Sequence, residues 1–267
     1  MNSVYRAIGI SKQSFHQRMD RHLQQLELQA QLEWVVKKIR QDHPRMSSRH
    51  MYRMLKPKGM GRDRFEKWCH DLGLKVKTKR SFRRTTNSIG VTRFVNRIKE
   101  LELRSVNQVW VSDITYYRIK ESFYYITLMM DLYSRRLIGY SVSKDLFTES
   151  TTIPALRRAI KTRKGQILEG LIIHSDGGGQ YYSKSFIQIT KTYGMLNSMA
   201  EDVYENPHAE RINGTIKNDY LRPYDPQNYK ELKQMTMKAI KLYNGQKPHK
   251  GLNYVSPIFY ESKLLVN

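Results

Sequence analysis

Cysteine is almost absent from this sequence, since Cys69 is the only one among 267 residues. A single cysteine cannot form an internal disulfide, and it excludes a zinc site built from several cysteines. Long apolar runs are also missing, because the most apolar stretch, 123–130, has the length of a strand and ends at Asp131. A membrane-spanning helix needs about 20 apolar residues, so we expect none. The first residues lack the charged-then-apolar pattern of a secretory signal peptide, and we therefore expect a cytoplasmic protein.

Acidic residues are scarce as well. The chain has 24 Asp and Glu against 47 Lys and Arg, which gives a formal net charge of +23. The excess is uneven, because the first 100 residues hold 24 of the basic side chains and only 8 of the acidic ones. A basic surface of this density is typical of proteins that bind a polyanion. Nucleic acid is the partner we expect, and an acidic membrane surface is the alternative.

Residues 1–95 are predicted to form a basic helical region. Apolar residues recur at helical spacing within 28–39. A short helix is predicted over 47–55, with the serine at its start as the N-cap, and another over 62–72. Two short helices joined by a turn indicate a helix-turn-helix-like DNA-binding region, and a plain helical bundle is the alternative. The basic segment 75–84 is expected to be a linker that lies along phosphates or is merely solvated.

Residues 105–222 alternate between strand and helix patterns. The predicted strands are 109–119, 123–130, 137–142, 171–175 and 195–199, and the predicted helices are 148–161, 183–193 and 207–221. This order favours an α/β domain with a ribonuclease-H-like fold, in which helices flank a mixed five-stranded sheet. Residues 226–267 are expected to form a C-terminal tail with one helix over 229–243.

Three acidic residues stand where this fold would bring them near one another. Asp113 lies inside the first strand, where a carboxylate is costly unless it is paired or bound to metal. Asp176 follows the fourth strand, at the end where open α/β sheets bind ligands. Glu210 lies on the helix after the fifth strand. Carboxylates are the ligands that Mg²⁺ prefers, so the three acids predict a site for hard divalent cations.

The helix that carries Glu210 has two distinct faces. Glu210 and Lys217 lie on one face at i and i+7, while Ile212, Ile216 and Tyr220 lie on a nearly opposite face. The apolar face suits the core. We therefore expect the glutamate to face a metal while the lysine reaches DNA along the same stripe.

Several of these segments resemble a known family. They are 110–116, 131–140, 174–181, 198–199, 210–217, 243–249 and 256–257. Together they resemble the second-frame product of IS-three-type insertion sequences, which are bacterial DDE transposases with a catalytic core like that of retroviral integrases. The resemblance covers nearly the whole chain and is most specific over 107–257.

The resemblance implies a DNA transposase that cleaves at the ends of its element and transfers strands into target DNA. It implies Asp113, Asp176 and Glu210 as catalytic and metal-binding residues, with one or two Mg²⁺ or Mn²⁺ ions. Glu205 is the alternative third ligand. Lys217 would contact the DNA at the element's ends.

Four further residues are predicted to bind DNA. They are Asn213, Arg211, Asn206 and Gln180. The resemblance also implies a homo-oligomer on DNA, a possible helix-turn-helix partner encoded by an upstream frame, and a nucleoid-associated location. A catalytically silent DNA-binding protein and a nuclease without strand transfer are the alternative functions.

Overall fold

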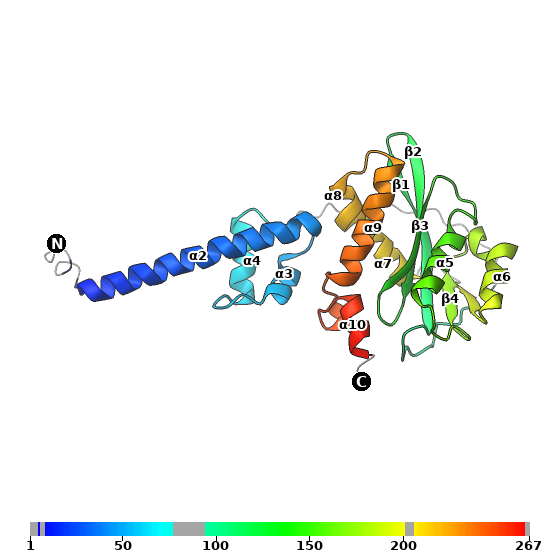
Figure 1. Cartoon of the computed structure of the whole chain (residues 1–267), viewed down its shortest axis with the longest axis horizontal. Coiled ribbons are helices and arrows are strands. Elements are labelled where there is room, and N and C mark those ends of the chain that lie inside the picture. Colours follow the sequence, from blue (N-terminus) through cyan, green and yellow to red (C-terminus); the bar gives the residue numbers. More distant parts are fainter. Residues whose placement is uncertain (1–4, 6–8, 77–93, 201–205, 265–267) are drawn as a thin grey trace. The chain divides into compact units, whose positions relative to one another are not determined.

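The computed structural model describes residues 5, 9–76, 94–200 and 206–264 (Figure 1). The chain divides into two compact units, residues 1–75 and 76–267. Segment 226–267, expected to be a separate tail, lies in the same unit as the predicted catalytic core. Within the described residues, no helix has the length and apolar character that crossing a membrane requires. Most of the basic linker, from residue 77 onward, lies outside the described residues.

Within residues 9–75, the smaller unit contains three helices. They are α2 (Lys12–Asp42), α3 (Ser48–Leu55) and α4 (Arg62–Asp71). The Ser47 hydroxyl accepts a hydrogen bond from the backbone N–H of His50 at 3.3 Å, as expected of an N-cap. α2 is much longer than the predicted 28–39 segment. Its core contacts are concentrated near its C-terminal end, where a small buried cluster forms from Val36, Met46, Met51, Phe65 and Cys69.

The larger unit is built on a five-stranded mixed sheet. The strands are β1 (Val109–Ile119), β2 (Ser122–Asp131), β3 (Leu137–Ser143), β4 (Ile172–Ser175) and β5 (Leu196–Met199). Their order across the sheet is β3-β2-β1-β4-β5. β1 pairs antiparallel with β2 and parallel with β4, and β5 is parallel to β4. This is the predicted ribonuclease-H-like topology, with β1 at the centre.

Helices cover both faces of this sheet (Figure 1). On one face, α5 (Thr152–Thr162) and α6 (Lys184–Thr192) enclose a core around Trp110, Leu156 and Phe186. On the other, α7 (Pro207–Thr215) and α9 (Tyr229–Gly245) enclose a second core. The short α8 (Arg222–Tyr224) and the unpredicted α10 (Pro257–Leu264) complete the unit.

Two helix boundaries differ from the sequence prediction for identifiable reasons. α5 begins at Thr152 rather than 148, which places Pro154 in the first helical turn. A proline is tolerated there because the first-turn N–H groups have no helical acceptor. After α7, the chain continues as a π-helix over Ile216–Leu221. A π-helix widens the turn, and periodicity at 3.6 residues does not reveal it.

Asp131 has a structural role at the end of β2. Its Oδ1 accepts hydrogen bonds from the backbone N–H groups of Tyr133 and Ser134, at 3.1 and 2.9 Å. Its Oδ2 accepts from the N–H of Asn107 at 2.7 Å and from Arg163 at 3.3 Å. These bonds fix the turn into β3.

Candidate active site

Asp113 and Asp176 are brought together by the register of two parallel strands. Ser112 of β1 lies opposite Ser175 of β4. Asp113 directly follows Ser112 in the sequence, and Asp176 directly follows Ser175. Asp113 lies on the central strand β1 and is half-buried, whereas Asp176 is exposed in the loop after β4. The two carboxylates therefore lie at the same edge of the parallel part of the sheet.

Glu210 approaches from the first turn of α7. This helix packs against β1 and β2, and its Ile212 is buried in the core below. Ile216 and Tyr220 are also buried, which confirms the predicted apolar face. The side chain of Glu210 is exposed. The alternative third ligand, Glu205, lies outside the described residues.

The charges of both other acids affect the pKa of Asp113. The pKa of Asp113 is raised to about 7, chiefly by burial, next by the charge of Asp176 and least by that of Glu210, while hydrogen bonds from Asn213 and the backbone of Ile114 oppose the rise. The pKa of Asp176 is also raised, because the surrounding protein removes part of its solvation. The backbone N–H of Gly178 donates to Asp176 Oδ1 at 3.2 Å and opposes that rise. The carboxylate of Asp113 therefore lies within reach of the charges of both other acids.

The side chains do not form a closed metal-binding group in this structure. Within the described residues, no set of three His, Cys, Asp or Glu side chains stands close enough together to hold a metal ion. Asp113 and Asp176 are fixed by the sheet and by hydrogen bonds, while Glu210 is exposed on its helix.

Two of the predicted DNA-binding residues form hydrogen bonds inside the protein, next to the acids. Asn213 is buried, and its Nδ2 donates to Asp113 Oδ2 at 2.7 Å. Asn206 is buried as well, and its Nδ2 donates to the backbone carbonyl of Ser112 at 3.2 Å. In this structure the two amides position Asp113 and the start of α7. Their contacts with DNA stay predictions.

The other three predicted DNA-binding residues are placed differently. Lys217 is half-buried, and its Nζ donates to Thr115 Oγ1 at 3.0 Å and lies 4.8 Å from the centre of the Tyr116 ring. Arg211 is exposed. Gln180 donates through Nε2 to the carbonyl of Leu146 at 3.0 Å. Lys217 and Arg211 remain available to an anionic ligand beside the acids.

The sequence did not predict the surroundings of His208. Arg135 Nη1 donates to His208 Nδ1 at 2.9 Å. Burial, followed by the charges of Arg135 and Arg211, lowers the pKa of His208 to about 4. This imidazole is therefore neutral near pH 7, and it links the turn after β2 to the first turn of α7. No sequence signal pairs two residues so far apart.

The aromatic residues after Asp176 pack rather than face solvent. Tyr181 is buried, and its hydroxyl lies 2.8 Å from Ser112 Oγ. The Tyr182 hydroxyl donates to the carbonyl of Asp176 at 3.3 Å. His174, on the strand before Asp176, is buried with its Nδ1 2.9 Å from Ser198 Oγ. These contacts hold the chain around Asp176 in place.

Comparison with known proteins shows that this site lies in a domain shared with other proteins. Residues 104–202 match a model described as an integrase core domain, and residues 197–257 match a second model of the same description. The catalytic core of the HTLV-2 integrase, solved in complex with magnesium, is 24% identical with a TM-score of 0.48, covering 58% of this chain and 95% of that one.

Bacterial insertion elements provide relatives that cover more of the chain. A 31 kDa protein of insertion element IS600 from Shigella sonnei is 32% identical over 209 residues, which is 76% of each chain. The transposase of IS904 from Lactococcus lactis is 28% identical, covering 74% of this chain and 79% of that one. Transposase InsF of IS3A from Escherichia coli is 30% identical, covering 60% and 55%. The chain therefore belongs to the IS3-type insertion-sequence transposases, the DDE-type polynucleotidyl transferases with an integrase core domain.

Proposed function

We propose that Asp113, Asp176 and Glu210 jointly bind the one or two Mg²⁺ or Mn²⁺ ions with which this transposase cleaves DNA at its element's ends and joins it to target DNA. The observation that carries this assignment is the strand register, which brings Asp113 and Asp176 to one edge of the sheet, with Glu210 in the first turn of the helix that packs on β1. A cation shared by the three carboxylates would relieve their mutual repulsion. Three carboxylates and water are also a donor set that suits these hard cations.

The protein's own groups prepare this site for a cation. Asn213 fixes the carboxylate of Asp113, and the N–H of Gly178 orients that of Asp176. Asn206 ties the beginning of α7 to β1, so that Glu210 stays at the same edge of the sheet. When bound, divalent cations supply charge neutralisation at the phosphate and activate the attacking oxygen.

Lys217 and Arg211 are the residues we assign to DNA beside the acids. Thr115, which Lys217 contacts, lies two residues after Asp113 and therefore on the same face of β1. Burial lowers the pKa of Lys217, as does the charge of Arg222, while Asp113 opposes this shift. A DNA phosphate at this position would supply the lysine with a counter-charge, which the neutral hydroxyl of Thr115 does not. Gln180 is a weaker candidate because its amide already has a partner.

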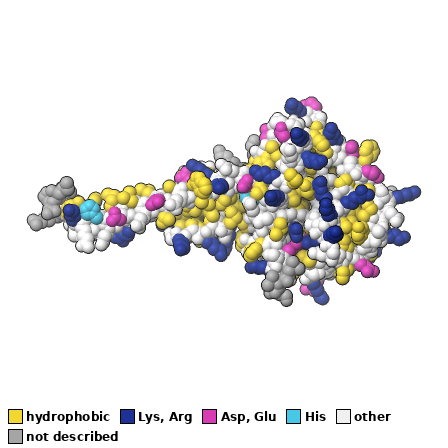
Figure 2. All heavy atoms as spheres, in the orientation of Figure 1, with side chains coloured by type: hydrophobic (Ala, Val, Ile, Leu, Met, Phe, Trp, Pro, Cys, Tyr) yellow, Lys and Arg dark blue, Asp and Glu magenta, His cyan; other side chains and the backbone are white. Residues whose placement is uncertain are grey.

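The smaller unit fits a role in recognising the element's ends. Its α3 and α4 are two short helices that pack together, and exposed Arg and Lys side chains lie along them. Figure 2 shows Lys and Arg side chains spread over the visible surface of the molecule. This accords with a DNA-binding region over 1–95, a catalytic core over 105–222 and a homo-oligomer assembled on DNA. A partner encoded upstream and a nucleoid-associated, cytoplasmic location complete the proposal.

A labelled donor-end assay with Mg²⁺ or Mn²⁺ tests the metal site. We expect joined products from the natural protein, and neither cleavage nor joining from Asp113→Asn, Asp176→Asn or Glu210→Gln. Glu169→Gln is the matched control, because it removes an exposed carboxylate elsewhere on the same unit. Cut but unjoined DNA would instead indicate a nuclease, and bound, unchanged DNA a silent binding protein. Activity in Glu210→Gln together with its loss in Glu205→Gln would overturn the choice of third ligand.

A further inference from the structure

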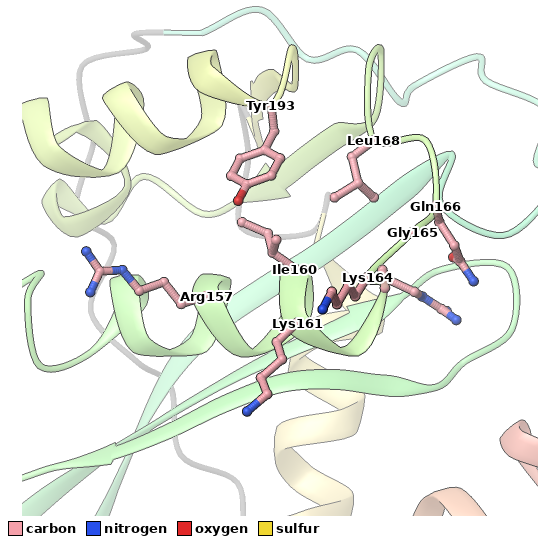
Figure 3. A pocket seen from close by; sticks show the side chains of 9 residues that line it. Arg157, Ile160, Lys161, Lys164, Gly165, Gln166, Leu168 and Tyr193 are labelled. Atoms are coloured by element: carbon pink, nitrogen blue, oxygen red, sulfur yellow. The ribbon is translucent and has the colours of Figure 1, made fainter.

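A basic pocket lies at the C-terminal end of α5 (Figure 3). Its volume is about 470 Å³. Nine residues line it, and none of them is acidic: Arg157, Ile160, Lys161, Arg163, Lys164, Gly165, Gln166, Leu168 and Tyr193. The proposed catalytic function does not use this pocket.

Three exposed cations form its rim. Arg157 and Lys161 are one helical turn apart on α5, and Lys164 follows at the next turn of the chain. Among the described residues, none of these three side chains forms an ion pair. Arg163 differs, because its guanidinium is buried against Asp131 and Glu261. The rim therefore offers three uncompensated positive charges at helical spacing to an anionic ligand.

The floor of the pocket is apolar and includes an aromatic ring. Ile160 is half-buried, and Leu168 is buried in the core beneath α5 and α6. Tyr193, at the end of α6, keeps 43% of its surface exposed. Figure 3 shows its ring pointing toward Ile160. An exposed aromatic ring beside a row of cations is the combination that binds an unpaired base and its phosphates.

The pocket and the acids lie at opposite ends of the sheet. Leu168 precedes β4, and the backbone N–H of Leu171 bonds to its carbonyl at 3.2 Å. β4 then runs from Ile172 to Ser175, beside Asp176. The four residues of β4 span about 13 Å, so a single nucleotide cannot occupy the pocket and contact the acids at the same time. The pocket is thus a binding site separate from the three acids.

We propose that this pocket binds a single strand of DNA, with Arg157, Lys161 and Lys164 on successive phosphates and Tyr193 stacked on an unpaired base. The proposal rests on DNA being the substrate of this enzyme. A duplex keeps its bases stacked inside, so it would use the cations and leave the apolar floor empty. An acidic protein segment would pair with the cations but would not require stacking on Tyr193.

The first test measures binding without chemistry. The full chain is titrated in EDTA with a labelled single strand of about 12 nucleotides at several salt concentrations. The triple variant Arg157→Gln, Lys161→Gln, Lys164→Gln should lower the slope of log affinity against log salt by about 2, since each lost phosphate contact removes about 0.7. The control Lys230→Gln, Lys233→Gln, Lys241→Gln removes the same charge from exposed positions on α9. Equal slopes in the two triple variants would overturn the proposal.

The second test isolates the stacking. Tyr193→Ala should weaken single-strand binding by at least about fivefold, while Tyr193→Phe should preserve it. A strand carrying iodouracil should photocross-link to the peptide that contains Tyr193. Unchanged affinity in Tyr193→Ala, or cross-links confined to other peptides, would refute base stacking and favour a protein ligand. Because these measurements omit metal, their failure is distinct from failure of the three acids as a metal site.

Discussion

At the scale of single residues, the site depends on groups that do not themselves face the substrate. Asp113 is the most enclosed of the three acids, and Asn213 holds its carboxylate from below. An amide that donates to a buried carboxylate stabilises the charged form and sets its orientation. Metal ligands commonly rely on such partners, and their loss weakens both metal binding and activity.

Asn213→Ala should therefore raise the Mg²⁺ concentration needed for half-maximal donor-end cleavage by about 10- to 100-fold. The reason is that Asp113 would lose the hydrogen bond that fixes its carboxylate. Metal titrations of cleavage rate measure the change. Gln188→Ala, an exposed position on α6, is the control and should show the natural requirement. An unchanged requirement in Asn213→Ala would contradict the positioning role.

Cys69 yields a prediction about pH. Burial raises the pKa of its thiol to about 11, from an ordinary value of 9.0. The unfolded chain therefore ionises first, so the stabilising contribution of the neutral thiol is complete below about pH 9 and declines as the pH rises toward 11. We expect a loss of about 2 kcal/mol in unfolding free energy across this range, seen in the transition of the smaller unit. Cys69→Ala should remove this part of the pH dependence, and an identical profile in the variant would show the attribution to be mistaken.

At the scale of elements, the contact between β3 and α5 requires a glycine. A Cβ on Gly139 would lie 2.2 Å from the carbonyl oxygen of Ala155 and 3.0 Å from the Cβ of Ala159. The first distance is to backbone, which cannot move without displacing the helix. Close approach of a helix to a strand is thus set by the absence of a side chain.

Gly139→Ala should lower the unfolding free energy by about 1 to 3 kcal/mol, because overpacking forces α5 away from the sheet. Gly245→Ala is the matched control, since nothing lies within 4 Å of its added Cβ and its φ is not positive. Denaturant unfolding of the two variants measures the difference. A Gly139→Ala protein as stable as the control would show that the helix accommodates the methyl group freely.

Element positions in the larger unit could be predicted closely from the sequence. β1 has the predicted bounds, and the other four strands differ by one or two residues at most, because alternation and apolar runs are local signals. The π-helix over Ile216–Leu221 and α10 were missed. The first is not revealed by periodicity at 3.6 residues, and the second is anchored by contacts with residues more than 90 positions away.

At the scale of the whole larger unit, a buried ion network joins three distant parts of the chain. Arg163 at the end of α5 pairs with Asp131 at the end of β2 and with Glu261 of α10. Ser134 and Arg136 also donate to Glu261. Burial by itself would raise the pKa of Glu261, but these hydrogen bonds outweigh it and lower the pKa. Its contribution to stability is therefore present above the ordinary carboxyl range and is lost as pH falls through the lowered value.

Arg163→Met should destabilise the larger unit by about 3 to 5 kcal/mol, because it leaves two buried carboxylates without their shared cation. Thermal or denaturant unfolding measures the loss. Arg118→Met is the control, since its ion pair with Glu121 is exposed and contributes only about 0 to 1 kcal/mol. Equal losses in the two variants would mean that the buried network does not anchor α10.

The sequence by itself determined the type and order of the strands and helices and the strong positive charge, and it predicted the three acids of the proposed site. These properties follow from local periodicity, composition and a family pattern, all of which can be read from the sequence alone. Only the tertiary structure decided that Asn213 holds Asp113, that Arg163 joins Asp131 to Glu261, and that a basic pocket forms beside Tyr193. The physical reason is that these contacts join residues up to 100 positions apart, and packing of whole elements selects such partners.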